Sequence, residues 1–317
     1  MTKRILLFPG QGSQYVGMGK KLAESFPPAK AILDKANTVL GFDLADILFN
    51  GPEDRLVRTD ITQPAIFTVS AMAMEAVKDA GVSFDYVAGH SLGEYSALYA
   101  AGAFSFEDGL ALVRLRGQLM AQAGDKSPGA MAAVLGLDPE KLASVLREAL
   151  DANLLQAGIV VVAANYNSPG QIVISGTVDG VEAATKMAEA AGAKKVVRLA
   201  VSGAFHSPLM EFAVPGLAEG LAKVSVSAPR VPLISNVEAS PVSEPEAIKS
   251  LLLKQLTSPV RWVESVQKAM SLGCLEALEV GPGKVLMGLA RGISRDLKVT
   301  PVENSEDLLR LTDSVKG

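Results

Sequence analysis

The segment 89–93, Gly-His-Ser-Leu-Gly, holds the most reactive arrangement of residues in the sequence. It fits the pattern G-x-S-x-G, in which a nucleophilic serine occupies a sharp turn between a strand and a helix. The pattern is common by chance, but here an apolar run at 84–88 precedes it and a helical pattern follows Ser91. The helix N-terminus would stabilise a developing oxyanion. The alternative is an ordinary glycine-bounded turn with a capping serine.

A serine hydroxyl is a weak nucleophile until a base accepts its proton. The sequence has two histidines, His90 and His206. Because the side chains of neighbouring residues diverge, we expect that His90 does not reach the Ser91 hydroxyl. A single histidine is more often a hydrogen-bonded structural residue, but here a nucleophile lacks a base and one candidate remains. We therefore predict that His206, in the segment 203–208, is the base.

The segment 9–14, Pro-Gly-Gln-Gly-Ser-Gln, directly follows the first predicted strand. One interpretation is a dinucleotide fingerprint, G-x-G-x-x-G, but Tyr15 occupies the position of the third glycine. Another is an oxyanion hole, in which a main-chain N–H from beside Gln11 acts together with the N–H of Leu92. A plain glycine-rich turn is the third. The serine turn at 89–93 favours the oxyanion hole.

The predicted helix 106–122 carries a charge in an apolar position. Arg116 lies in the middle of an apolar stripe formed by Leu112, Val113, Leu119 and Met120. A buried guanidinium is costly unless it is paired, and no carboxylate on the same stripe is an obvious partner. Arg116 therefore either pairs with a distant Asp or Glu or binds an anion from outside. A guanidinium matches a carboxylate through two parallel hydrogen bonds, so the second alternative predicts a substrate with a free carboxylate.

Composition excludes several other classes of protein. The 317 residues are 49% hydrophobic and 20% charged, which suffices for a large core in one large domain or two smaller ones. The net charge of −4 and the lack of a long basic run do not indicate nucleic-acid binding. One cysteine, Cys274, and two histidines argue against disulfides and a metal site. Without a signal-peptide layout or a bilayer-length apolar stretch, we expect a cytoplasmic protein that binds no membrane. No feature of the sequence demands a dimer, so we expect a monomer.

Strands and helices alternate at both ends of the chain, which predicts a parallel sheet. Pro64 is expected at the first turn of a helix that runs to about residue 80. The segment 105–108, Ser-Phe-Glu-Asp, has capping-box spacing and opens the helix to about 122. Residues 124–129 are expected to form a linker. Further elements are expected as strands at 5–8, 84–88, 233–235 and 275–280, and as helices at 19–25 and 29–40.

The middle of the chain has a different pattern. The order is strand 130–135, helix 139–150, strand 159–164, turn 167–170, strand 171–175, helix 178–191 and strand 194–199. The turn Asn-Ser-Pro-Gly makes the two central strands a hairpin. This β-α-β-β-α-β order is the ferredoxin-like pattern. We therefore predict an α/β protein with a small domain at 128–200 inserted into a large one formed by 1–127 and 201–317.

Six motifs follow one another along nearly the whole chain, in the segments 9–14, 63–65, 89–95, 115–117, 203–208 and 279–283. Together they resemble malonyl-CoA:acyl carrier protein transacylases and the related acyltransferase domains of polyketide and fatty-acid synthases. The resemblance implies an α/β-hydrolase-like large domain and a ferredoxin-like small one.

The resemblance also implies roles for individual residues. Ser91 is the nucleophile and His206 the base, with no acid behind it. Instead, a main-chain carbonyl, expected at Gln255, orients the histidine. Arg116 binds the malonyl carboxylate. The remaining implied residues are Gln11 and Leu92 for the oxyanion-hole N–H groups, and Gln63 and Met120 for substrate binding.

Phe205, directly before the histidine, bears on substrate choice. In the resembling family, malonyl-selective members carry Ala-Phe-His-Ser here, whereas methylmalonyl-selective ones carry a smaller residue. A phenyl ring at Phe205 would crowd an α-methyl group. The alternative is that Phe205 only packs in the core.

The implied reaction is ping-pong transfer of malonyl from coenzyme A to the phosphopantetheine thiol of acyl carrier protein, without a bound cofactor. It would serve fatty-acid or polyketide synthesis. Two rivals stay open: a hydrolase with the same nucleophile, and a non-catalytic subunit that binds the carrier. An acidic carrier would need a basic patch, with Lys194 and Lys195 or Lys284 and Arg291 as candidates, although a solvated charged edge explains these residues as well.

Overall fold

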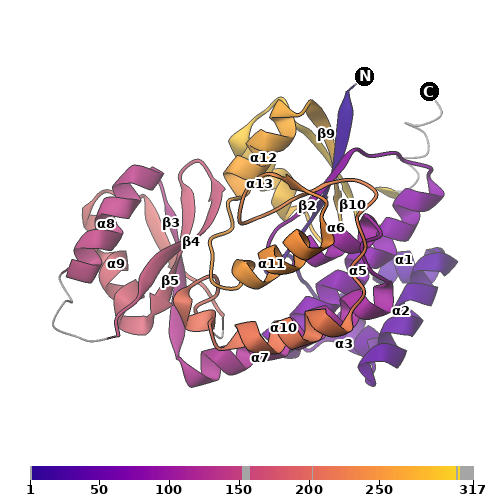
Figure 1. Ribbon diagram of the computed structural model, residues 1–317, viewed down its shortest axis with the longest axis horizontal. Helices are drawn as coiled ribbons and strands as arrows, with labels where there is room; N and C mark the ends of the chain where they lie inside the picture. The colour runs from indigo at the N-terminus through magenta and orange to yellow at the C-terminus, as the bar shows by residue number, and fades with distance from the viewer. Residues whose placement is uncertain (1, 152–157, 202, 305, 308–317) are drawn as a thin grey trace.

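The computed structural model describes residues 2–151, 158–201, 203–304 and 306–307. In this part of the chain two lobes lie side by side, a large one and a small one (Figure 1). The large lobe contains a six-stranded sheet that is parallel except for its last strand. Its order is β10 (Lys298–Val302), β9 (Cys274–Val280), β1 (Lys3–Phe8), β2 (Tyr86–Gly89), β7 (Leu233–Ile234) and β8 (Pro241–Val242).

Both faces of this sheet are covered by helices, because the side chains of a strand alternate between its faces. In β1, Leu6 and Phe8 face the core cluster that includes helices α2, α5, α6 and α7, whereas Ile5 and Leu7 face helices α12 and α13. The helices are α1 (Lys20–Ser25), α2 (Pro27–Leu40), α3 (Leu44–Asn50), α4 (Glu53–Leu56), α5 (Thr59–Asp79), α6 (Gly93–Ala100), α7 (Phe106–Lys126), α10 (Ala213–Lys223), α11 (Pro245–Gln255), α12 (Trp262–Ser271) and α13 (Val285–Ile293), with a short 3₁₀ helix at Pro208–Met210.

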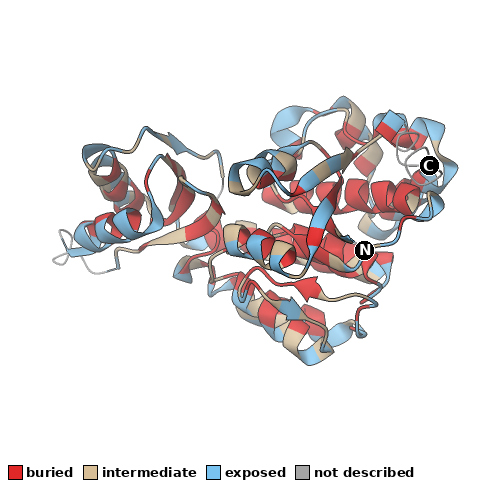
Figure 2. Cartoon of the chain, turned by 90° about the horizontal axis from the view of Figure 1, so that it is seen from above, coloured by how far each residue is buried: buried red, intermediate tan, exposed pale blue. Residues whose placement is uncertain are grey.

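The small lobe is a separate four-stranded antiparallel sheet with its own apolar core. Its strands are ordered β4-β5-β3-β6, and the helices α8 and α9 pack against them (Figure 1). Buried residues gather at the centre of each lobe (Figure 2). The elements are β3 (Gly129–Leu135), α8 (Pro139–Asp151), β4 (Val161–Ser168), β5 (Gln171–Thr177), α9 (Val178–Ala190) and β6 (Lys195–Arg198).

Most of the elements expected from the sequence are present within a few residues. The Ser105 hydroxyl caps helix α7 by accepting the Asp108 N–H, as the capping-box spacing predicts. The predicted hairpin is confirmed, with Pro169 and Gly170 between its strands. The linker expected at 124–129 is wrong, because α7 continues to Lys126 and β3 begins at Gly129. Helices α3 and α4 and strand β10 were not anticipated.

The prediction that Pro64 lies at the first turn of its helix is also wrong. Helix α5 begins five residues earlier, at Thr59, and Pro64 lies inside it. A proline has no N–H to donate to the carbonyl four residues before it, which here belongs to Asp60. The Asp60 carbonyl instead accepts a hydrogen bond from the Arg114 side chain of α7. A tertiary contact therefore satisfies the acceptor that the proline leaves unused.

None of the helices in the described residues is both long and apolar enough to cross a bilayer. The same part of the chain holds no group of three or more His, Cys, Asp or Glu residues placed to bind a metal ion.

Two helical glycines provide a test of how tightly α7 packs. A Cβ at Gly117 would lie 2.7 Å from the Thr59 carbonyl oxygen of α5, whereas a Cβ at Gly288 in α13 would meet no atom within 4 Å. We expect Gly117→Ala to lower the free energy of unfolding by about 1–3 kcal/mol through overpacking. The matched control Gly288→Ala should raise it by about 0.5–1 kcal/mol, because alanine favours helix. Urea unfolding measures both, and equal effects would contradict the close contact.

Candidate active site

Ser91 lies at the turn between β2 and α6, with a backbone φ of 52°. Few non-glycine residues adopt this left-handed region, and such strain is common at functional sites. The flanking glycines are required by close packing. A Cβ at Gly89 would lie 1.9 Å from the Gly93 carbonyl carbon, and one at Gly93 would lie 2.0 Å from the Phe8 carbonyl oxygen. The serine turn therefore sits directly against strand β1.

Asn236 holds the serine turn in place from the loop after β7. Its side-chain oxygen accepts the Ser91 N–H at 2.7 Å, and its side-chain nitrogen donates to the Gly89 carbonyl at 2.7 Å. Sequence analysis did not single out this residue. The sequence feature that could have identified Asn236 is its position just after a short predicted strand. Polar residues at the carboxyl ends of parallel strands line ligand sites in such sheets.

His206 lies within hydrogen-bond distance of the serine, with 2.8 Å between its Nε2 and the Ser91 Oγ. Its Nδ1 lies 2.8 Å from the main-chain carbonyl oxygen of Gln255. Because a carbonyl can only accept, Nδ1 carries the hydrogen and Nε2 is free to accept the serine proton. Burial, and after it the positive charge of Arg116, lower the pKa of His206 to about 3. The ring is therefore neutral at neutral pH, as a general base must be.

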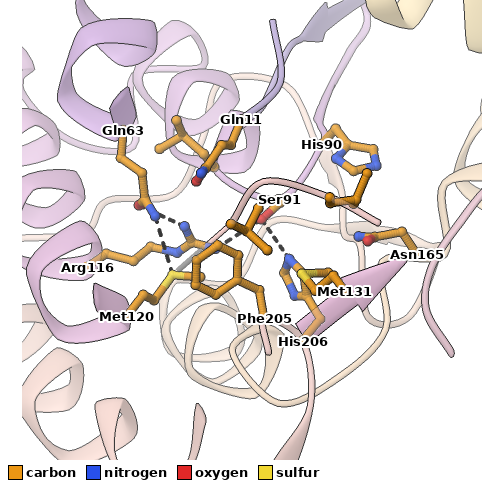
Figure 3. A pocket seen from close by; sticks show the side chains of 13 residues that line it. Gln11, Gln63, His90, Ser91, Arg116, Met120, Met131, Asn165, Phe205 and His206 are labelled. Carbon is orange, nitrogen blue, oxygen red and sulfur yellow. Dashed lines mark hydrogen bonds between the residues drawn. The ribbon is translucent and has the colours of Figure 1, made fainter. Parts of the chain in front are cut away.

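His90 points elsewhere. Its Nε2 lies 2.8 Å from the Asn167 side-chain oxygen, and its ring meets the Trp262 ring edge-on at 5.5 Å between centroids. In Figure 3 its ring lies apart from the Ser91 hydroxyl, on the side away from His206. The expectation that His90 does not reach the serine agrees with this placement.

Arg116 is 1% exposed and is surrounded by neutral groups. Its Nη1 donates to the Gln63 side-chain oxygen at 2.8 Å. Its Nη2 donates to the Gln255 side-chain oxygen at 2.9 Å and to the Ser91 Oγ at 3.1 Å. The guanidinium carbon lies 5.6 Å from the centre of the Tyr95 ring, a favourable cation–π distance.

This arrangement bears on the two alternatives left open for Arg116. Within the described residues, Arg116 forms no ion pair with an Asp or Glu, and its buried Nε has no hydrogen-bond partner. A buried cation with unused donors, 3.1 Å from the Ser91 hydroxyl, is suited to bind an anion from outside. Gln63 in turn donates to the Met120 sulfur at 3.3 Å, so both residues lie beside the guanidinium (Figure 3).

A cavity of about 90 Å³ opens between the two lobes at the serine. The large lobe contributes Gln11, Leu92 and Arg116, while Met131 of β3 and Asn165 of β4 come from the small lobe. The main-chain N–H groups of Gln11 and Leu92 donate to no acceptor in the described part of the chain, so both are available to an oxyanion. Further lining residues are Gln63, His90, Ser91, Met120, Leu199, Val201, Phe205 and His206.

The structure thus brings eight of the nine residues predicted for the site to the cavity wall. The ninth, Gln255, lies behind it and contacts His206 through its main chain. The four basic residues considered for a carrier patch, Lys194, Lys195, Lys284 and Arg291, are all exposed.

Comparison with known proteins identifies the family. The model of the acyl transferase domain family matches residues 5–306. The chain belongs to this family and is an acyltransferase, so the family resemblance found in the sequence is confirmed.

Individual relatives of this acyltransferase align over nearly their full length. A Bacillus subtilis (strain 168) protein named malonyl CoA-acyl carrier protein transacylase is 46% identical over 97% of this chain and 96% of its own. The solved structure of the malonyl CoA-acyl carrier protein transacylase from Coxiella burnetii is 37% identical and superimposes with a TM-score of 0.94, covering 100% of this chain and 98% of the other. A structure of a type II PKS acyl-carrier protein in complex with its malonyl-transacylase matches at 38% identity and a TM-score of 0.93, covering 99% and 100%.

The influence of Arg116 on His206 predicts a pH effect. Because the guanidinium charge lowers the pKa of His206, Arg116→Ala should raise that pKa. The acidic limb of kcat/KM, which reports the free enzyme, should then move to higher pH. We would measure acyl transfer from acetyl-CoA, which has no carboxylate, over a pH range that extends below the His206 pKa of about 3.

Arg114→Ala is the matched control, because Arg114 lies on the same helix but pairs with Asp60. This variant should keep the acidic limb of the unaltered enzyme. If the acidic limb of kcat/KM lay at the same pH in Arg116→Ala and in Arg114→Ala, the result would contradict the electrostatic coupling of Arg116 to His206.

Proposed function

We propose that this acyltransferase moves a malonyl group from malonyl-CoA to the phosphopantetheine thiol of acyl carrier protein, through an ester on Ser91. The observation that carries the proposal is the buried Arg116, which has no carboxylate partner among the described residues and lies 3.1 Å from the Ser91 hydroxyl. A malonyl group has a free carboxylate two bonds from its thioester carbonyl. A cation this close to the nucleophile can therefore hold the carboxylate while the carbonyl reacts.

In the first half of the cycle, the Ser91 oxygen attacks the thioester carbonyl and His206 takes the hydroxyl proton at Nε2. The N–H groups of Gln11 and Leu92 stabilise the tetrahedral oxyanion. The intermediate collapses with cleavage of the carbon–sulfur bond, and His206 returns the proton to the departing coenzyme A thiolate. Malonyl-Ser91 and free coenzyme A result.

In the second half, the carrier thiol gives its proton to His206 and its sulfur attacks the seryl ester. The same oxyanion forms, the ester bond breaks, and the proton returns from His206 to the Ser91 oxygen. The Gln255 carbonyl keeps the imidazole in the tautomer that both halves need. It compensates the transient imidazolium charge less than a carboxylate would.

The names of the relatives support the donor and the acceptor. The Bacillus protein is named for malonyl-CoA and acyl carrier protein, and one matching structure is a complex between a malonyl-transacylase and a polyketide carrier. Fatty-acid synthesis and polyketide synthesis are both compatible with the site. The exposed pairs Lys194 and Lys195, and Lys284 and Arg291, are the basic residues that we propose for an acidic carrier. A cytoplasmic, monomeric enzyme without a bound cofactor stays a prediction.

We also propose that the two lobes are domains, with the small one at 128–200 inserted between 1–127 and 201–317. The ferredoxin-like assignment is supported by the β-α-β-β-α-β order and by the antiparallel order β4-β5-β3-β6. The α/β-hydrolase-like assignment of the large domain is supported by its mostly parallel sheet and by the serine turn after β2.

The covalent step predicts a mass change on one residue. After mixing with malonyl-CoA, intact-protein mass spectrometry should show a malonyl adduct on the unaltered enzyme and none on Ser91→Ala, which lacks the nucleophile. Arg116→Ala should acquire acetyl from acetyl-CoA in preference to malonyl, because the cation for the malonyl carboxylate is gone. Arg114→Ala should keep the preference for malonyl.

The rival functions give different results in the same experiment. An unmodified protein with malonyl-CoA left intact would contradict catalysis and favour a subunit that only binds the carrier. An unmodified protein with free malonate and coenzyme A accumulating would favour a hydrolase.

Phe205 predicts the response to an α-methyl group. Its ring is 6% exposed and lines the cavity, so we expect it to exclude methylmalonyl-CoA. Phe205→Ala should raise the ratio of kcat/KM for methylmalonyl-CoA over malonyl-CoA by about tenfold, the scale of one methyl group in a pocket. Phe104 is equally buried but lies away from the cavity, so Phe104→Ala should leave the ratio unchanged. An unchanged ratio in Phe205→Ala would mean that this ring only packs in the core.

A further inference from the structure

Glu94 is a buried carboxylate that the proposed mechanism does not use. It is the second residue of α6, three residues after the nucleophile, and is 1% exposed. Both of its oxygens accept hydrogen bonds. Oε1 accepts the Asn236 main-chain N–H at 2.6 Å, and Oε2 accepts from the Gln255 side-chain nitrogen. Glu94 is absent from the cavity wall, so any effect on substrate must pass through another residue.

The Gln255 side chain connects this carboxylate to Arg116. Its nitrogen donates to Glu94 and, at 3.0 Å, to the Ser91 main-chain carbonyl, while its oxygen accepts from Arg116 Nη2 at 2.9 Å. An ionised carboxylate only accepts hydrogen bonds, and a guanidinium only donates them. Glu94 therefore forces the amide nitrogen to face it, which leaves the amide oxygen for Arg116.

The positions of the Arg116 and Glu94 side chains also favour an Arg116 guanidinium that is free to bind an anion. Within the described residues, Arg116 has no carboxylate within ion-pair distance, and the Glu94 carboxyl group lies behind the Gln255 amide, where it favours the charged guanidinium. Burial raises the pKa of Glu94 to about 8, even though the hydrogen bonds from Asn236 and Gln255 and the charge of Arg116 oppose the rise. Because both oxygens accept N–H groups, the bonded form that fits the site is the carboxylate. A direct ion pair would instead occupy the guanidinium that a substrate carboxylate needs.

We propose that Glu94 is a positioning residue for recognition of the substrate carboxylate, acting through the Gln255 amide to hold Arg116 ready for an anion. This inference rests on the proposed malonyl transfer and names the residue that prepares its carboxylate site. Glu94 does not touch the reacting atoms.

The test compares a substrate that has a carboxylate with one that does not. In Glu94→Gln, one of the two acceptor oxygens is replaced by an NH₂ group, which only donates. This donor then faces either the main-chain N–H of Asn236 or the side-chain nitrogen of Gln255, which are donors too. The Gln255 amide is then free to turn its nitrogen toward Arg116. We expect the ratio of kcat/KM for malonyl-CoA over acetyl-CoA to fall by about tenfold or more, the scale of one hydrogen bond to a charged group. The loss should appear as a higher KM for malonyl-CoA, with transfer from acetyl-CoA much less affected.

Two further variants make the result specific. Glu279 is a second fully buried carboxylate, which accepts the main-chain N–H groups of Leu286 and Met287 at 2.8 Å each, away from the cavity. Glu279→Gln should leave the ratio unchanged even where it lowers the melting temperature. Gln255→Leu keeps the main-chain carbonyl that contacts His206 but removes the amide, so it should lower the ratio as Glu94→Gln does. Adding Glu94→Gln to Gln255→Leu should change the ratio by less than about twofold, because the connecting amide is already gone.

Each outcome decides the proposal. An unchanged ratio in folded Glu94→Gln, or equal losses for both substrates, would overturn it, because equal losses indicate a structural role in the serine turn. If Glu94→Gln does not fold, an unchanged ratio in Gln255→Leu overturns it instead. Failure of the unaltered enzyme to transfer malonyl would contradict the proposed function itself, and this is measured before any variant is compared.

Discussion

The buried guanidinium of Arg116 is the constraint on which the rest of this site depends. Burying a cation is costly, and the protein offsets that cost with neutral acceptors instead of a carboxylate. Gln63 comes from α5, Arg116 from α7 and Gln255 from α11, so three helices must converge for the charge to be tolerated. The close contact of Gly117 with α5 keeps α7 near the helix that carries Gln63.

The same cation shapes the chemistry beside it. Its charge adds to burial in lowering the pKa of His206, which keeps the imidazole neutral and able to accept a proton. A carboxylate behind the imidazole would oppose that effect, whereas the Gln255 carbonyl orients the ring without adding a charge. Gln255 therefore serves two groups at once, His206 through its main chain and Arg116 through its side chain.

The serine turn is held by contacts that leave it little freedom. Ser91 has a left-handed backbone, its neighbouring glycines pack against main-chain atoms, and Asn236 bonds the main chain on both sides of His90. A strained conformation persists only where its surroundings over-determine it. The hydroxyl, the two N–H groups that we propose as the oxyanion hole and the helix N-terminus are thus placed before a substrate binds, as electrostatic stabilisation of a transition state requires.

The sequence by itself determined the local features. The pattern around Ser91 and the misplaced charge at Arg116 each depend on residues close together in the chain, as do the capping box and the hairpin, and the shortage of histidines is a plain count. Only the tertiary structure decided the partners. Gln63 and Gln255 lie 53 and 139 residues from Arg116, and Asn236 lies 145 residues from Ser91. Pro64 inside α5 belongs to the same group, because its tolerance depends on Arg114, 54 residues from Asp60. Periodicity and turn chemistry act over a few residues, whereas a buried polar group takes whichever partner the packed elements bring to it.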